Sequence, residues 1–232
     1  MGFLLLCIIL LSNIDAQSIN TYIYSFDRTV IKNNGHIETQ TGNLYSNNNL
    51  VYIEIKSPLN QILVIKKTET LIYYPIEKDA ILISNSSIPL MPFHSSLLAF
   101  NKEDFGLTEK KFTLKNTKFD IHNKSMITYW KPPNNQLDEM DEVVLNYKNN
   151  NIVSIEAYDK RKKILTVTKF DGFIDIDNII MPSSISTTEW YNNDESITDS
   201  IYIKNISIDK EIPNEIIHFQ IPNDINIKEI KW

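Results

Sequence analysis

The residues able to do acid–base or metal chemistry are scattered through this sequence. Its four histidines, His36, His94, His122 and His218, stand apart from one another and from any nucleophile motif. HExxH, GxSxG and glycine-rich phosphate-loop motifs, which fix catalytic groups at set spacings, do not occur. The sequence therefore predicts no catalytic residue, no cofactor and no metal site. The alternative is a site assembled in three dimensions from scattered residues, as in some hydrolases.

Two acidic clusters need an interpretation. Asp171, Asp175 and Asp177 lie within FDGFIDIDN, and oxygen-rich loops can hold calcium. Because the bidentate glutamate of a calcium loop is missing and isoleucines alternate with the aspartates, we interpret this cluster as a solvated strand edge. Residues 138–142 (DEMDE) are predicted to be a solvated acidic loop, with a docking surface for a basic partner as the alternative.

The charge balance argues against nucleic acid as a partner. The net charge is −6, and the 23 lysines and arginines are dispersed rather than gathered on one face. The nearest basic run is Lys160 to Lys163, which follows Asp159 and is predicted to be a solvated hairpin end.

The first sixteen residues, MGFLLLCIILLSNIDA, form a short apolar run that ends in a small residue. Such a run is too short to span a bilayer comfortably and is typical of a secretory signal peptide. We expect cleavage after Ala16, export to the periplasm, and one mature domain over residues 17–232. Because Cys7 is the only cysteine, the mature domain would contain neither a disulfide nor a thiolate metal site.

Alternation of apolar and polar residues dominates from Ile19 onward and predicts a mainly β fold. Short turns rich in Asn, Gly and Ser join the strands, so we expect one strongly curved antiparallel sheet. The predicted strands cover residues 22–31, 36–45, 50–56, 61–66, 70–74, 80–84, 111–114, 119–122, 125–130, 142–147, 152–158, 164–170, 185–191, 196–208 and 217–220.

Residues 88–107 interrupt this pattern. Ser95 is predicted to be the N-cap of a short helix over SLLAF, and KEDFGL to form a second short helix ending at Gly106. Isolated helices of this length are marginal in water, so they should lie on the sheet.

Several strands are apolar on both faces. In Leu50 to Lys56 the alternation is regular, but Ile62 to Ile65 is an unbroken apolar run. Strands of this kind are buried on both sides. A curled sheet meets this requirement either with an ordinary filled core or with a lined cavity for lipid beneath the helices, and the pattern alone does not distinguish the two.

Short motifs follow one another in a fixed order: G-x-L-Y from Gly42, the Ser57-Pro58 turn, QILVI from Gln61, TLIYYP from Thr70, the helical segment 88–107, and Phe219-x-x-Pro222. This order, over about residues 20–230, resembles the LolA family of periplasmic outer-membrane lipoprotein carriers. The resemblance implies an incomplete antiparallel barrel capped by lid helices. The family's lid-fastening arginine falls where this chain has Asn47 and Asn48, so the lid should close differently here, or the protein should bind another lipid or a partner.

The resemblance also implies a function. We expect a non-catalytic, monomeric carrier of lipoprotein acyl chains or other lipids, passing cargo from an inner-membrane donor protein to an outer-membrane acceptor protein. The alternative is a cell-envelope β-domain that binds a protein partner. The predicted lid residues are Leu97, Leu98, Phe100, Phe105 and Leu107. The predicted cavity residues are Val51, Ile53, Ile55, Leu63, Ile65, Leu71, Tyr73, Ile81, Ile83, Met126 and Tyr129.

Overall fold

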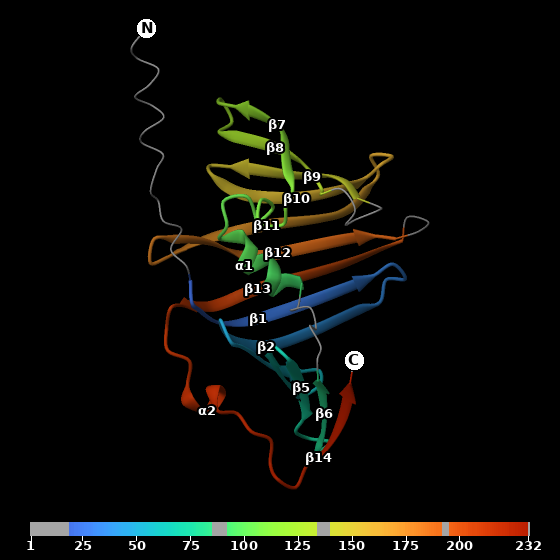
Figure 1. The fold of residues 1–232 in the computed structure, drawn as a ribbon, viewed down its shortest axis with the longest axis vertical. Helices are drawn as coiled ribbons and strands as arrows, with labels where there is room; N and C mark the ends of the chain where they lie inside the picture. The colour runs from blue at the N-terminus through green and yellow to red at the C-terminus, as the bar shows by residue number, and fades with distance from the viewer. Residues whose placement is uncertain (1–18, 85–91, 134–139, 192–194, 232) are drawn as a thin grey trace.

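A computed structural model of the chain describes residues 19–84, 92–133, 140–191 and 195–231 (Figure 1). The signal peptide predicted over residues 1–16 lies outside the described residues. One sheet of 14 strands makes up most of the molecule, in the order β14-β6-β5-β4-β3-β2-β1-β13-β12-β11-β10-β9-β8-β7. The strands are β1 (Thr21–Lys32), β2 (Ile37–Asn47), β3 (Leu50–Ser57), β4 (Gln61–Lys66), β5 (Glu69–Tyr74), β6 (Asp79–Ser84), β7 (Thr113–Asp120), β8 (Ser125–Lys131), β9 (Met140–Lys148), β10 (Asn151–Asp159), β11 (Ile164–Ile176), β12 (Ile179–Trp190), β13 (Ser196–Ile208) and β14 (Asn226–Lys231).

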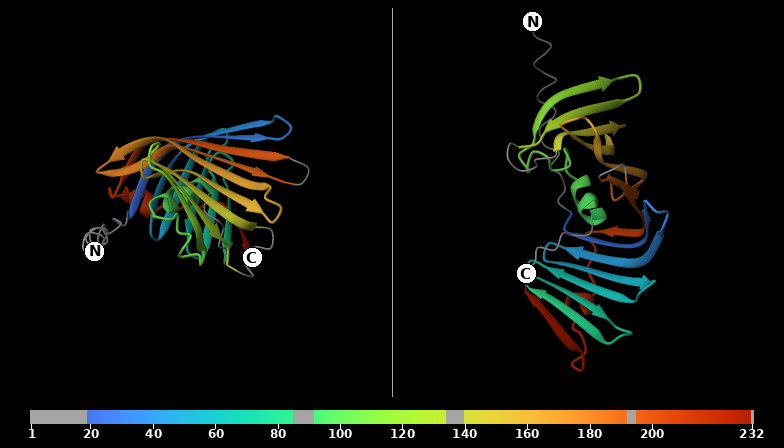
Figure 2. Two further views of the ribbon diagram at one scale, coloured as in Figure 1. Left: turned by 90° about the horizontal axis from the view of Figure 1, so that it is seen from above. Right: turned by 90° about the vertical axis from the view of Figure 1, so that its right-hand side faces the viewer.

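The sheet curls around a single helix and does not close into a barrel. Helix α1 (Pro92–Phe100) lies on the concave face, with the two wings of the sheet bending toward it (Figure 2). The predicted fold class, a strongly curved antiparallel sheet with short helices, is confirmed. Among the described residues, no helix is both long and apolar enough to cross a bilayer.

Alternation and turn chemistry account for the central strands. Tyr22, Tyr24 and Phe26 of β1 are buried while the residues between them are partly exposed, which is the period of a strand with one face in the core. The β9–β10 turn places Asn149 and Asn150 at φ values of 51° and 67°, the left-handed pair that a two-residue hairpin turn requires.

Gly42 of β2 shows how closely the sheet is packed. A Cβ atom at this position would lie 2.3 Å from the backbone oxygen of Glu54 and 2.8 Å from the Phe26 ring. The register between β2 and β3 shifts beside this residue, between Thr41 and Gly42. Glycine is therefore required where the Phe26 ring crosses the irregular strand.

Two sequence predictions in the helical segment are wrong. Ser95 lies inside α1 and is not its N-cap, because the helix begins at Pro92. The predicted KEDFGL helix is a series of turns instead. Phe105 and Gly106 adopt φ values of 57° and 75°, which end a helix, and the Asp104 carboxylate accepts hydrogen bonds from the backbone N–H groups of Gly106 and Thr108.

The C-terminal segment also differs from its prediction. The strand predicted at residues 217–220 is absent there, and Asn214–Ile217 forms the short helix α2. Ile216 and Phe219 both contact the convex face of the sheet. They are three residues apart, and this spacing is typical of one side of a helix rather than of one face of a strand. The chain then adds β14, which pairs in parallel with β6, so the sheet is antiparallel except at this edge.

Three further strands are longer than predicted. β7 is one strand with an irregularity between Leu114 and Asn116, where the sequence suggested two strands. β11 and β12 extend through the FDGFIDIDN segment and meet at a turn formed by Asp177 and Asn178. Asp171, Asp175 and Asp177 are exposed on this hairpin, which confirms the solvated strand edge.

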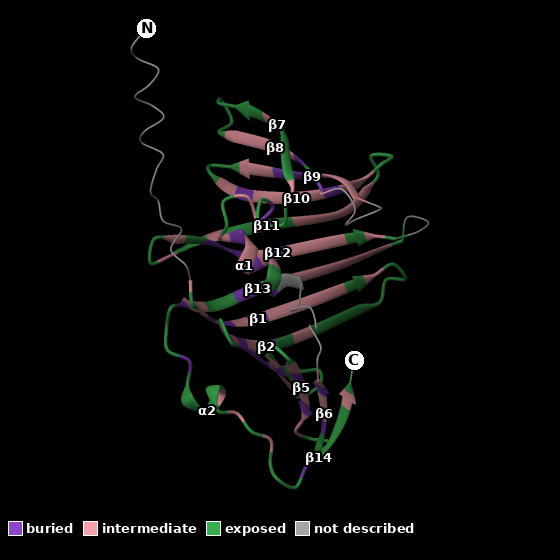
Figure 3. Cartoon of the chain, viewed as in Figure 1, coloured by how far each residue is buried: buried purple, intermediate pink, exposed green. Residues whose placement is uncertain are grey.

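Burial follows the curvature. The buried segments run along the central strands and α1, while β7, α2 and β14 are mostly exposed (Figure 3). Each wing has additional cover: the segment after α1 contacts β8 to β10, and the C-terminal segment lies against the convex face of β3 to β6. The strands that are apolar on both faces therefore have α1 on one side and the C-terminal segment on the other.

Candidate functional site

The concave face carries the main apolar cluster of the molecule. Five predicted cavity residues belong to it: Val51, Ile53, Ile55, Leu63 and Ile65. Strand register extends this face to β6, because Leu63 pairs with Ile72 and Ile72 pairs with Ile81. In the same way, Ile65 pairs with Thr70, and Thr70 pairs with Ile83, so the buried Ile83 also lies on the concave face.

Leu71 and Tyr73 lie on the opposite face, so their prediction as cavity residues is corrected by the register. Leu71 pairs with Val64, and Tyr73 pairs with Ile62. Both pack on the convex side beneath Phe219 of the C-terminal segment. The face that a side chain occupies can be assigned only when the pairing register of its strand with the neighbouring strand is known. A shift of this register by one residue moves every side chain of the strand to the other face.

Met126 and Tyr129 of β8 cannot share a face, because they are three positions apart and successive side chains of a strand alternate between the two faces. Met126 pairs with Tyr147, whose side chain packs on the concave clusters, and it therefore lies on the predicted side. Tyr129 pairs with Val144 on the other side, where Lys118 Nζ lies 5.1 Å from the centre of its ring. Tyr129 is the third cavity residue that the register corrects.

All five predicted lid residues contact the concave face. Leu97 is completely buried in the main cluster, and Leu98 packs partly exposed against it. The Phe100 ring lies 5.2 Å from that of Phe170, and Phe105 lies 5.8 Å from the same ring. Leu107 is buried in the second cluster with Trp130 and Leu145 of β8 and β9. Helix and turns together thus cover the middle of the sheet.

A buried histidine holds α1 on the sheet. His94 is fully buried; its Nδ1 lies 3.1 Å from the Tyr24 hydroxyl oxygen and its Nε2 lies 3.1 Å from Ser46 Oγ, both in hydrogen bonds. The Tyr22 ring meets the imidazole edge-on, with centroids 6.0 Å apart. Burial lowers the pKa of His94 to about 4, so the side chain is neutral at physiological pH. Asn101 adds a second link by donating to the Tyr22 hydroxyl at 2.6 Å.

Sequence reasoning missed this role of His94. The histidine was one of four isolated residues with no motif around it. Its position within PFHSSLLAF, an otherwise apolar and hydroxyl-containing helix, was the available signal, because a buried imidazole needs polar partners on the surface that it faces.

A cavity remains open beside α1, and we call it the rim pocket. Its volume is about 660 Å³. Leu98, Tyr22, Val51 and Ile65 provide apolar walls, and the turns at 47–49 and 66–68 form a polar entrance. Pockets of roughly 300–1,000 Å³ with apolar walls and a few polar groups are typical of small-molecule sites. The centre of the concave face is filled by α1, and open volume remains at the edge.

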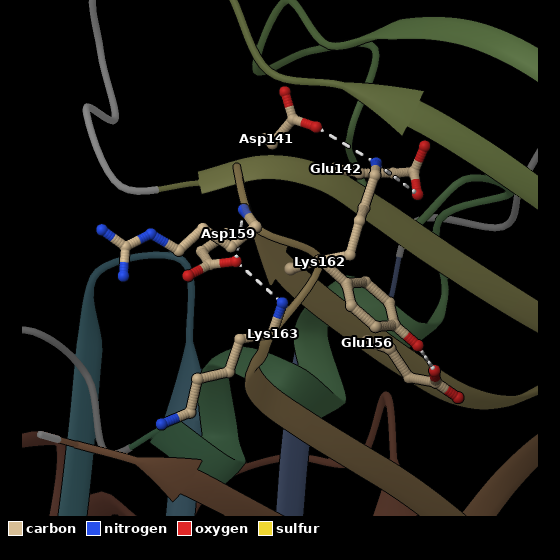
Figure 4. Close-up of polar contacts among 8 residues, drawn as sticks. Asp141, Glu142, Glu156, Asp159, Lys162 and Lys163 are labelled. Carbon is tan, nitrogen blue, oxygen red and sulfur yellow. Dashed lines mark hydrogen bonds and ion pairs between the residues drawn. The ribbon is translucent and has the colours of Figure 1, made fainter. Parts of the chain in front are cut away.

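The acidic region considered as a docking surface is partly neutralised where it is described. Lys162, in the β10–β11 turn, forms ion pairs with Asp141 at 3.1 Å and with Glu142 at 3.3 Å (Figure 4). Residues 138 and 139 lie outside the described part. The exposed turn at 160–163 confirms the predicted solvated hairpin end. Over the described ranges, no three His, Cys, Asp or Glu side chains gather as a metal site would require.

Comparison with solved structures identifies the fold. A DUF1329 family protein from Desulfovibrio piger aligns over 88% of this chain and 92% of its own, with a TM-score of 0.60 and 14% identity. A domain named for outer membrane lipoprotein sorting, from Vibrio parahaemolyticus, aligns over 86% and 89% with a TM-score of 0.56 and 14% identity. A LolA superfamily protein from Nitrosomonas europaea aligns over 85% and 89% with a TM-score of 0.53 and 12% identity.

Sequence comparison gives no further assignment, since no protein-family model and no curated protein matches the chain. At sequence identities this low, structural similarity is evidence for the fold alone. In fold, the chain is a LolA-like half-barrel, as the order of its sequence motifs predicts.

Proposed function

We propose that this protein is a periplasmic carrier that takes acyl chains of lipoproteins, or other lipids, into the rim pocket and transfers them toward the outer membrane. The observation that carries the proposal is the placement of α1, a short helix whose apolar side chains lie on a concave apolar sheet beside an open pocket of about 660 Å³. The apolar leader predicted at residues 1–16 supports export. A structural neighbour named for outer membrane lipoprotein sorting supports the cargo class.

The energetics of α1 suit a carrier. Burying a sixteen-carbon acyl chain releases about 12 kcal/mol at roughly 0.8 kcal/mol per methylene, which alone would make release very slow. Lifting Leu97, Leu98 and Phe100 off the sheet costs roughly 1.5–3 kcal/mol for each side chain. Closing α1 over the sheet therefore opposes lipid binding and makes release possible, with no catalytic step. Delivery would use a donor protein at the inner membrane and an acceptor protein at the outer membrane.

Titration with a fluorescent fatty-acid probe tests the pocket. The wild type should bind a short-chain probe saturably in the open pocket with α1 in place. Leu98→Asp should weaken the affinity for this probe by about tenfold or more, because a carboxylate would enter the apolar wall of the pocket. Leu98 is the cleaner position for this test, since Phe100 is buried against the Phe170 ring and its replacement would also destabilise the fold.

Leu59→Asp is the matched control. Leu59 is 56% exposed in the turn between β3 and β4, away from the residues that line the rim pocket, so its variant should bind like the wild type. Circular dichroism should show the same strand content in all three proteins. Non-saturable binding by the wild type, or equal affinity in Leu98→Asp, would rule out the pocket as the lipid site.

A further inference from the structure

The hairpin of β7 and β8 presents large apolar side chains to solvent. Ile121, in the turn, is 91% exposed, and Phe119, near the end of β7, is 70% exposed. β7 is the outermost strand of its wing, with β8 on its inner side and nothing beyond it in the described sheet. Phe119 pairs with Met126 and so extends the concave face, but the segment that covers that face ends before it. Exposed groups of this size are typical of binding surfaces.

The same hairpin is basic in an acidic protein. From Thr113 to Lys124 the hairpin contains one aspartate, Asp120, and three lysines, whereas the whole chain has a net charge of −6. All three lysines are exposed, and none forms an ion pair with a carboxylate in the described part of the chain. Asp120 is turned into its own loop, where it accepts hydrogen bonds from the backbone N–H and side-chain amide of Asn123. The lysines are Lys115, Lys118 and Lys124.

The hairpin turn lies on the rim of the sheet where the pocket opens. Strand directions in the antiparallel part place the turns at 47–49, 66–68, 149–150 and 121–124 along one rim, and Figure 1 shows the β7–β8 turn on the side where β1 begins. The last two turns are joined by a hydrogen bond from Asn149 N–H to the Lys124 carbonyl at 3.0 Å. The hairpin and the pocket entrance can thus face the same surface.

We propose that the β7–β8 hairpin docks the protein on anionic phospholipid bilayers, with Phe119 and Ile121 inserted among the acyl chains and the lysines against headgroup phosphates. Apolar side chains flanked by lysines match both layers of such a membrane, the hydrocarbon and the negatively charged interface. On the same rim the β11–β12 hairpin ends with Asp175 and Asp177, so the charge is uneven along the rim and the lysines of the β7–β8 hairpin would orient the molecule. This inference goes beyond the carrier function, because it concerns a surface separate from the pocket.

Vesicle flotation of the full chain tests the docking surface. The wild type should float with vesicles of phosphatidylglycerol and phosphatidylcholine, should not float with phosphatidylcholine alone, and should be released at high salt. The double variant Phe119→Ser/Ile121→Ser should lose about tenfold or more in bound fraction, as should Lys115→Gln/Lys118→Gln/Lys124→Gln. All variants share the apolar residues at the N-terminus, so differences between variants report on the hairpin.

Ile76→Ser and Lys160→Gln are the matched controls. Ile76 is 73% exposed and Lys160 is exposed, but both lie in turns on the opposite rim, so these variants should float like the wild type. Equal flotation of the double variant, or equal binding to neutral vesicles, would overturn the proposal. So would a dimer in solution that the double variant abolishes, because the hairpin would then cover a second copy of the chain. Fluorescent probe binding should be unchanged in every hairpin variant, which separates this result from failure of the pocket.

Discussion

His94 is a neutral imidazole that contacts Tyr22, Tyr24 and Ser46, and protonating it would place a charge against hydroxyl groups and aromatic rings that carry no opposite charge. Its pKa falls from 6.5 to about 4 on burial. The folded state therefore has its full stability with respect to His94 above pH 6.5. It loses part of that stability as the pH falls toward about 4, because over this range the histidine is protonated in the unfolded chain but still neutral in the folded protein. At about 1.4 kcal/mol per pKa unit, the full loss is about 3 kcal/mol.

Urea unfolding of the wild type and His94→Gln checks this at neutral and acidic pH. Glutamine can also hydrogen-bond to Tyr24 and Ser46, but it does not titrate. The wild type should lose more stability than the variant between about pH 7 and about pH 4.5. Parallel pH profiles would mean that His94 does not control the stability of α1 on the sheet. Carboxylates elsewhere affect both proteins equally, so the difference isolates the imidazole.

Among the elements, the central strands could be predicted well because their alternation and turn residues are local. Which face a side chain occupies depends on register, so Leu71, Tyr73 and Tyr129 were assigned to the wrong side. The parallel β14 could not be anticipated either, since its partner β6 lies far away in sequence and NIKEIK carries no signal for direction. His94 was missed because its two partners come from other strands.

The C-terminal segment is the element that stabilises the β3–β6 wing from outside. The Phe219 ring lies 5.4 Å from that of Tyr52 and 6.3 Å from that of Tyr73, so it joins two strands of the convex face. Phe219→Ala should lower the free energy of unfolding by about 1–3 kcal/mol, less than for a fully buried phenylalanine because the ring is partly exposed. Chemical denaturation measures the change.

Ile217→Ala provides the comparison for Phe219→Ala. Ile217 belongs to the same segment, is 41% exposed, and packs in neither convex cluster, so its loss should change stability by about 0.5 kcal/mol or less. Similar losses in the two variants would show that the segment contributes through general burial and not through the Phe219 contact with the two tyrosines.

The whole molecule combines one continuous sheet with a short helix that belongs to no other layer. Every strand is hydrogen-bonded to a neighbour, but the 9-residue α1 depends on one apolar face and on the contacts of His94 and Asn101. Such a short helix has little stability of its own, so we expect it to separate from the sheet without unfolding the strands. A carrier needs this difference in stability, because lipid would replace α1 against the concave face.

Hydrogen exchange followed by mass spectrometry should reveal this difference. In the free protein, amides of α1 should exchange about tenfold or more faster than those of β12 and β13, since local opening costs less than global unfolding. Adding a fatty acid that saturates the pocket should accelerate exchange in α1 further and slow it in the strands that line the pocket. His94→Gln should preserve this pattern at neutral pH, since its amide retains both hydrogen bonds. If α1 and β12 exchange at one common rate and a fatty acid changes neither, helix and sheet open as a single unit, and α1 cannot act as a lid.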